Sequence, residues 1–297
     1  MNHFRAWGLL GVVVAGTACE RTKAPPPVDS TAVPNTRTPE VTAVAAGSSW
    51  DAGAGPLLLV AAASPTQAFV VVPDTASSAS TLAKIPHPAS VTLFGRGGTV
   101  QTADLPTVTD TGACITATLD ATPPPRPWNI GFIGGVVAPL AMDSVESLSH
   151  ADSASMVASM NRLASALPND SAGRFSGLPF TVRSILRFAI PSGVKVVVAT
   201  LTRQINQEAT PLQEHTFLIA EQPKNDTTYA KAYAERSYGE EETIESRDVL
   251  AGALVGASRN PAIILVRDYG NATAYGLLER GVDGQWHARW TSARRHC

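Results

Sequence analysis

Charge is scarce in this sequence. Asp, Glu, Lys and Arg make up 16% of the residues, well below the quarter that is usual in soluble proteins. The 23 basic and 25 acidic residues leave a formal net charge of −2, so the chain has no basic field that could hold nucleic acid or an anionic lipid surface. We therefore exclude nucleic acid as a partner. Ala, Thr, Ser, Pro and Gly replace the missing charge, a mixture that favours extended tethers and β-rich folds.

Long apolar runs are missing as well. No stretch reaches the roughly 20 apolar residues that a membrane-spanning helix needs. The apolar run of residues 8–15 follows a single positive charge at Arg5 and ends in small residues. A basic head, a short apolar core and a small-residue cleavage point are typical of a signal peptide. Residues 1–18 are therefore predicted to direct export and then to be removed.

Residues 16–19, Gly-Thr-Ala-Cys, close this segment. Small residues directly before a cysteine resemble the lipobox of bacterial lipoproteins. The resemblance implies that Cys19 is acylated, becomes the new N-terminus and anchors the mature chain to a membrane of the cell envelope, at the periplasmic or outer surface. Gly16 departs from the family pattern, where a large aliphatic residue is usual. Ordinary cleavage after Ala18 with secretion, or retention of the segment as an anchor, therefore stays open.

Cysteine is rare: the sequence has three, and only Cys114 and Cys297 remain after Cys19. In an exported chain two leftover thiols usually pair. Closing so long a loop would stabilise the fold by about 5 kcal/mol at most. A disulfide between Cys114 and Cys297 would tie the C-terminus to the first half of the chain. The alternatives are two free buried thiols or an intermolecular bond from Cys297.

The chain after the signal peptide divides by composition. Residues 19–48 are rich in Pro and Thr, without apolar periodicity, and are predicted to be an extended tether. Residues 49–297 are predicted to form a single integrated β-rich domain. Within it, residues 49–140 and 181–297 are candidate sub-units, bridged by a helix.

The predicted fold class is mainly β (α+β), built from antiparallel meanders. Ser-Pro-Thr-Gln at 64–67 and Gly-Arg-Gly-Gly at 95–98 are hairpin turns between short apolar runs. The glycine-rich turn lacks the Lys-Ser/Thr ending of a phosphate loop. Strands are expected at residues 56–63, 68–72, 90–94, 99–105, 114–119, 128–133, 183–190, 194–203, 215–221, 229–237, 249–255, 262–268, 273–279 and 285–291.

One amphipathic helix is predicted at about residues 149–167. Apolar side chains, among them Met156, Met160 and Ala164, recur at spacings of three and four. Ser149 or Asp152 can cap its start, and Pro168 ends it. Such a stripe favours packing across one face of a sheet.

The C-terminal half contains an internal repeat. Residues 196–201 parallel 249–254, and residues 215–221 parallel 262–268, each followed by a Tyr-bearing strand. In outline this resembles the blade-like repeats of integrin-type propellers, although a generic antiparallel meander gives the same pattern. The repeats are thus propeller-like or sandwich-like. Where that family carries a calcium loop, residues 256–261 contain no carboxylate, so calcium is not expected there.

No catalytic constellation appears in the sequence. It has no Gly-x-Ser-x-Gly elbow, and its histidines are dispersed. No pair of ligands has the spacing of a zinc site, so we predict no metal and no cofactor. The densest acidic patch, Glu240, Glu241, Glu242, Glu245 and Asp248, is interpreted as a solvated loop. Its functional alternative is a site for a basic partner or a cation.

Trp286 and Trp290 lie four residues apart in an expected strand. Strict alternation would place both rings on one face. An exposed pair would form an aromatic platform for a sugar or peptide, whereas a buried pair would belong to the core, which is the commoner use of tryptophan.

These observations favour an exported cell-envelope lipoprotein that is a non-catalytic binding or structural module, with an unknown protein or glycan as partner. The alternatives are a secreted or periplasmic hydrolase whose site is assembled only in the fold and, less favoured, a periplasmic small-ligand receptor.

Overall fold

The structure is a computed structural model that describes residues 57–72, 85, 89–133, 137–168, 173–205 and 211–296. The predicted signal peptide, Cys19 and the predicted tether lie outside these residues. Contacts divide the chain into residues 1–39 and residues 40–297, and all described residues belong to the second unit. Strands account for 56% and helices for 9% of the structure, which confirms the mainly β class. No helix in the described part of the chain is long and apolar enough to cross a bilayer.

The first six strands close into a barrel in the order β1-β2-β5-β4-β3-β6. Their bounds are β1 Leu57–Ala61, β2 Gln67–Val70, β3 Ala89–Phe94, β4 Val100–Asp110, β5 Ile115–Asp120 and β6 Ile130–Ile133. Both expected hairpins are confirmed as the antiparallel pairs β1–β2 and β3–β4. Gly98 adopts a φ of +82°, a conformation that favours glycine over any other residue in this tight turn. The barrel interior is filled by apolar side chains such as Leu59, Val91 and Leu105.

Two five-stranded antiparallel sheets make up the rest of the fold. The inner sheet has the order β16-β15-β14-β13-β7, and the outer sheet has the order β12-β11-β10-β9-β8. The strands of the inner sheet are β7 Val137–Leu140, β13 Ser246–Val255, β14 Asn260–Asp268, β15 Thr273–Arg280 and β16 Trp286–Thr291. Those of the outer sheet are β8 Asp143–Ser144, β9 Thr181–Ala189, β10 Lys195–Ile205, β11 Leu212–Gln222 and β12 Ala230–Glu240.

The internal repeat corresponds to equivalent strands of the two sheets. The meander β10-β11-β12 in the outer sheet matches β13-β14-β15 in the inner sheet. One apolar cluster contains buried residues of both sheets, including Val198 and Ile219 from the outer sheet and Ile263 from the inner one. The two sheets therefore pack face to face as a sandwich, and the repeats are not blades of a propeller.

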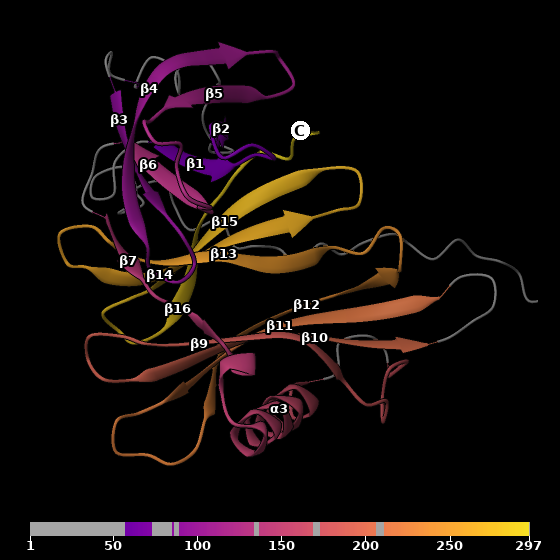
Figure 1. Ribbon diagram of the computed structural model, residues 1–297. Helices are drawn as coiled ribbons and strands as arrows, with labels where there is room; N and C mark the ends of the chain where they lie inside the picture. Colours follow the sequence, from indigo (N-terminus) through magenta and orange to yellow (C-terminus); the bar gives the residue numbers. More distant parts are fainter. Residues whose placement is uncertain are drawn as a thin grey trace, which may run out of the picture. The chain divides into compact units, whose positions relative to one another are not determined.

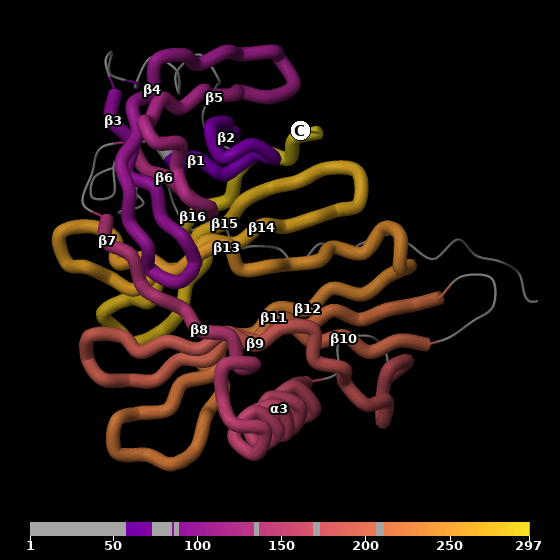
Figure 2. The backbone as a smooth tube through the Cα atoms, in the orientation of Figure 1, coloured from indigo at the N-terminus to yellow at the C-terminus, as the bar shows by residue number. Residues whose placement is uncertain are grey.

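Apolar clusters define four layers, which can be followed in Figures 1 and 2. Phe94 and Phe132 of the barrel pack with Ala253 and Ile264 on one face of the inner sheet. The other face of the inner sheet packs on the outer sheet. The far face of the outer sheet is covered by α3, His150–Ser165, through Met160 and its neighbours. The order of layers is barrel, inner sheet, outer sheet and helix.

The helix begins as predicted, because the Ser149 side chain accepts a hydrogen bond from the backbone N–H of Asp152. A 3-10 turn, η1 Val145–Ser147, precedes it. At its other end Arg236 of β12 donates to the backbone carbonyls of Ala164 and Pro168. Arg236 also pairs with the buried Glu214. A cation thus satisfies the free carbonyls of the last helical turn and fastens α3 to the outer sheet.

Strands β7 and β8 were not predicted. Strand β7 is only four residues long and contains Pro139, which has no N–H to donate to a sheet ladder. Strand β8 has only two residues. Their place is nevertheless important, because β7 pairs with β13 at the edge of the inner sheet and β8 pairs with β9 in the outer sheet. Consecutive short strands therefore connect the two halves of the sandwich.

Candidate functional site

A cavity of about 490 Å³ opens between the two sheets where their shared apolar layer ends. Along β10 the side chains that face the inner sheet change from Val196 and Val198, in the apolar cluster, to Thr200 and Thr202, in the cavity wall. Along β11 they change from Ile219 to His215. The cavity is therefore a polar continuation of the sandwich core.

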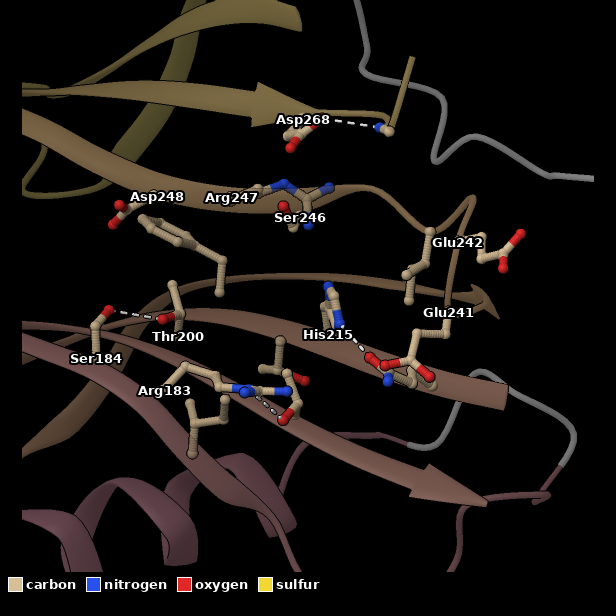
Figure 3. A pocket seen from close by; sticks show the side chains of 17 residues that line it. Arg183, Ser184, Thr200, His215, Glu241, Glu242, Ser246, Arg247, Asp248 and Asp268 are labelled. Carbon is tan, nitrogen blue, oxygen red and sulfur yellow. Dashed lines mark hydrogen bonds between the residues drawn. The ribbon is translucent and has the colours of Figure 1, made fainter. Parts of the chain in front are cut away.

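The floor of the cavity is a set of cross-strand rows on the outer sheet (Figure 3). One row places Ser184, Thr200 and Phe217 side by side on β9, β10 and β11. The next row pairs Thr202 with His215. The hydroxyls of Ser184 and Thr200 are hydrogen bonded at 2.7 Å. Because these groups stand on paired strands, their spacing is fixed by the sheet itself.

Arg183 reaches the floor because of a β-bulge. The register of β9 against β10 shifts between Thr200 and Leu201, so Arg183 is the extra residue of β9. Its Nε donates to the Thr202 Oγ1 at 3.2 Å, and Figure 3 shows its side chain lying along the floor. Among the residues that the structure describes, Arg183 is not paired with any carboxylate within 4.0 Å.

His215 is held by two oxygen atoms. Its Nε2 lies 2.9 Å from Gln213 Oε1, and its Nδ1 lies 3.3 Å from the backbone oxygen of Glu245. A neutral ring can donate to only one of them. The pKa of His215 is lowered, chiefly because burial penalises the charged ring. The contact with the Glu245 carbonyl raises it, whereas the charges of Arg183 and Arg247 lower it further. His215 is therefore neutral at pH 7.

The rim of the cavity is acidic. Glu241, Glu242, Asp248 and Asp268 line it, all with exposed side chains. Arg96, in the glycine-rich turn of the barrel, lies 4.0 Å from Asp248 and donates to the backbone oxygen of Val249 at 2.5 Å. The acidic patch is thus not simply a solvated loop, because three of its residues stand at the opening of a cavity.

Glu245, the fourth member of that patch, is buried in a ring of four charges. Arg247 Nε lies 2.9 Å from Glu235 Oε2, and its Nη2 lies 3.0 Å from Glu245 Oε1. Arg267 spans the same two carboxylates at 3.0 and 2.8 Å. None of the four side chains is more than 13% exposed. The ring joins β12 of the outer sheet to β13 and β14 of the inner sheet, beside the cavity.

Glu235 stays charged in spite of its burial. Burial raises the pKa of Glu235, but Arg247 and Arg267 together outweigh it, and the pKa is lowered overall. Burial and the neighbouring Glu235 carboxylate raise the pKa of Tyr233. Tyr233 therefore stays protonated and donates its hydroxyl hydrogen to Glu235.

The described residues offer no assembled nucleophile. The Ser237 hydroxyl, in the same row as His215, donates to the Glu245 carbonyl at 2.8 Å instead of to the imidazole. Within the described ranges, no group of three or more His, Cys, Asp or Glu side chains is placed to hold a metal ion. The arrangement is suited to holding a polar molecule by many hydrogen bonds.

The structure does not form the aromatic platform. Trp286 is 4% exposed, lies in the cluster between the two sheets and donates its Nε1–H to Glu221 at 2.7 Å. Trp290 packs in the other cluster, against the barrel. A bulge in β16 shifts the register between Leu277 and Leu278, so the two rings face opposite sides of the inner sheet. The expectation of one shared face was wrong because strict alternation fails at a bulge.

Of the other predicted site residues, Cys19, Cys114 and Cys297, the structure describes one. Cys19 and Cys297 lie outside the described residues. Cys114 is buried directly before β5. Sequence reasoning missed Arg183, Thr200, Thr202 and Gln213, whose only signal was the change from apolar to polar residues at alternate positions of neighbouring strands.

The ring of charges predicts a large effect of one substitution. Glu235→Gln leaves two buried guanidinium groups sharing the single carboxylate of Glu245, and removing one partner of a buried pair costs about 3–5 kcal/mol. Urea denaturation should show a loss of this size in the free energy of unfolding. Glu240→Gln, an exposed position of the same strand, is the matched control and should change it by less than about 0.5 kcal/mol. Equal effects of the two substitutions would contradict the ring's role.

No protein-family model matches the chain, and no curated protein has a matching sequence.

Proposed function

We propose that this chain is an exported, lipid-anchored binding module of the bacterial cell envelope, and that the cavity between its two sheets holds the ligand. The observation that carries the proposal is the change of the sandwich interior from apolar to polar at one level across β9, β10 and β11. Folding alone does not require hydroxyl groups and an imidazole at this level of the sandwich. A ligand that forms hydrogen bonds with them does require them.

The cavity has the properties of a binding site. Its volume lies within the roughly 300–1,000 Å³ of small-ligand pockets. Its floor stands on hydrogen-bonded strands, so little entropy is lost in ordering it when a ligand binds. Ser184, Thr200 and Thr202 present hydroxyl groups, which both donate and accept hydrogen bonds.

A hydrolase is the second candidate, and one observation favours it. His215 lies in the cavity with a lowered pKa, as a general base would. Both of its ring nitrogens, however, face Gln213 and the Glu245 carbonyl, and Ser237 donates elsewhere. The geometry therefore supports binding better than nucleophilic catalysis.

Export and anchoring rest on the N-terminal sequence, with Cys19 as the residue that carries the lipid. The predicted disulfide has support from the fold. Near the C-terminus, the Arg295 guanidinium donates to the backbone carbonyls of Gly112 and Ala113, at 3.3 and 3.4 Å. The last described residues therefore lie beside the residues that precede Cys114.

The cavity is tested by a fragment screen. Saturation-transfer NMR with a library of monosaccharides, amino acids and small carboxylates should find ligands of the full-length protein. Thr202→Trp fills the floor and should abolish these signals, whereas Ser155→Trp, at an exposed position of α3, should leave them. The absence of any ligand, or signals that survive Thr202→Trp in a folded protein, would refute the assignment of the cavity.

Anchoring is tested by metabolic labelling of the bacterium with an alkyne analogue of palmitate. The wild-type protein should be labelled and recovered with membranes. The Cys19→Ser variant should be unlabelled. A wild-type protein that carries no label would rule out the lipid anchor.

The disulfide is tested by mass mapping of the exported protein without reductant. Peptides that contain Cys114 and Cys297 should be found joined and should separate on reduction. Alkylation of both thiols before reduction would show that the bond is absent.

A further inference from the structure

We propose that the ligand of the cavity is an uncharged sugar, such as the end of a glycan chain. The inference rests on the proposed function, because it assumes that the cavity is a binding site, and it adds the chemical class of the ligand. The charges around the cavity and the hydrogen-bonding groups that its floor leaves available both favour such a ligand.

The rim disfavours an anion. Four carboxylates line the opening, from Glu241, Glu242, Asp248 and Asp268, and of these only Asp248 lies within 4.0 Å of a described cation, Arg96. A carboxylate or phosphate would pass these like charges before it reached Arg183. Repulsion between like charges at an opening lowers both the rate and the affinity of binding.

The floor disfavours a cation. Arg183 lies along it without a carboxylate partner in the described part of the chain. Arg247 stands behind it in the wall. The charges of Arg183 and Arg247 both lower the pKa of His215, less than burial does and against the effect of Glu241. An ammonium group on the floor would be repelled by the same two arginines. A neutral ligand is repelled neither by the carboxylates of the rim nor by the arginines of the floor and wall.

The free hydrogen-bonding groups match hydroxyls. Thr202 Oγ1 accepts from Arg183 Nε, so its own hydrogen is available to donate. Ser184 and Thr200 use one hydroxyl hydrogen in their mutual bond, which leaves the other for a ligand. The rim carboxylates can only accept. A ligand that donates at the rim and accepts on the floor can do both through hydroxyl groups, and a sugar carries several of them.

The test compares trisaccharides that differ in charge. Isothermal titration of the full-length protein in detergent uses the β-1,4 trimer of N-acetylglucosamine and cellotriose as neutral probes. The β-1,4 trimer of glucosamine is the cationic probe, and trigalacturonate is the anionic one. We expect at least one neutral trimer to bind about tenfold more tightly than either charged one, a difference of about 1.4 kcal/mol. A charged trimer that binds as tightly as the neutral ones would overturn the inference.

Two variants connect binding to the floor of the cavity. Thr202→Val removes one hydroxyl and should weaken neutral binding at least about fivefold, roughly 1 kcal/mol. Thr118→Val, an exposed position of the barrel, is its control and should have no effect. A loss of binding in Thr118→Val as large as that in Thr202→Val would contradict binding on the floor of the cavity.

The outcomes separate this inference from the proposed function. If no trisaccharide binds while other polar fragments still bind in a way that Thr202→Trp abolishes, the sugar is wrong and the cavity assignment stands. If nothing binds at all, both fall. If a trisaccharide binds and is recovered cleaved, the ligand class stands and the non-catalytic role is wrong.

Discussion

The fold depends on burial of the inner sheet on both faces. Along β14, Ile263 and Leu265 pack toward the outer sheet while Ile264, between them, packs toward the barrel. An antiparallel sheet usually keeps one face in water, whereas the central strands of this sheet are covered on both faces. Close packing extends to its edge, where a Cβ on Gly252 would lie 2.9 Å from the carbonyl oxygen of Leu140 in β7. The barrel and the outer sheet are therefore both held by the inner sheet.

Four largely buried charged residues lie where these apolar layers end. Glu235, Glu245, Arg247 and Arg267 form a closed ring at the turn from the outer to the inner sheet. Buried pairs add little net stability compared with apolar residues of similar shape, but breaking them is expensive. If one sheet slid along the other, buried guanidinium groups would lose their carboxylates. The ring thus fixes the offset of the two sheets, and with it the height of the cavity beside them.

Much of the fold could be predicted because it depends on patterns among neighbouring residues of the sequence. The expected strands are present, and so is the helix with its Ser149 cap, since alternation and capping depend on neighbouring residues. Closure of the barrel could not be predicted, because it depends on pairing of β6 with both β1 and β3, which are distant in sequence. The positions of Trp286 and Trp290 were mispredicted for a related reason: a single bulged residue reverses the faces, and bulges are set by the partner strand.

The candidate site could not be predicted from motifs, because a sheet assembles a surface from every second residue of several strands. On β10 the face that packs in the core at Val198 lines the cavity two and four residues later, at Thr200 and Thr202. A slip of one residue would turn Leu201 into the cavity and the threonines toward the helix. The register that buries the apolar residues therefore also sets the polar floor. A site of this kind leaves no contiguous signature, and it becomes visible only when strands are read side by side at the level where their inward-facing residues stop being apolar.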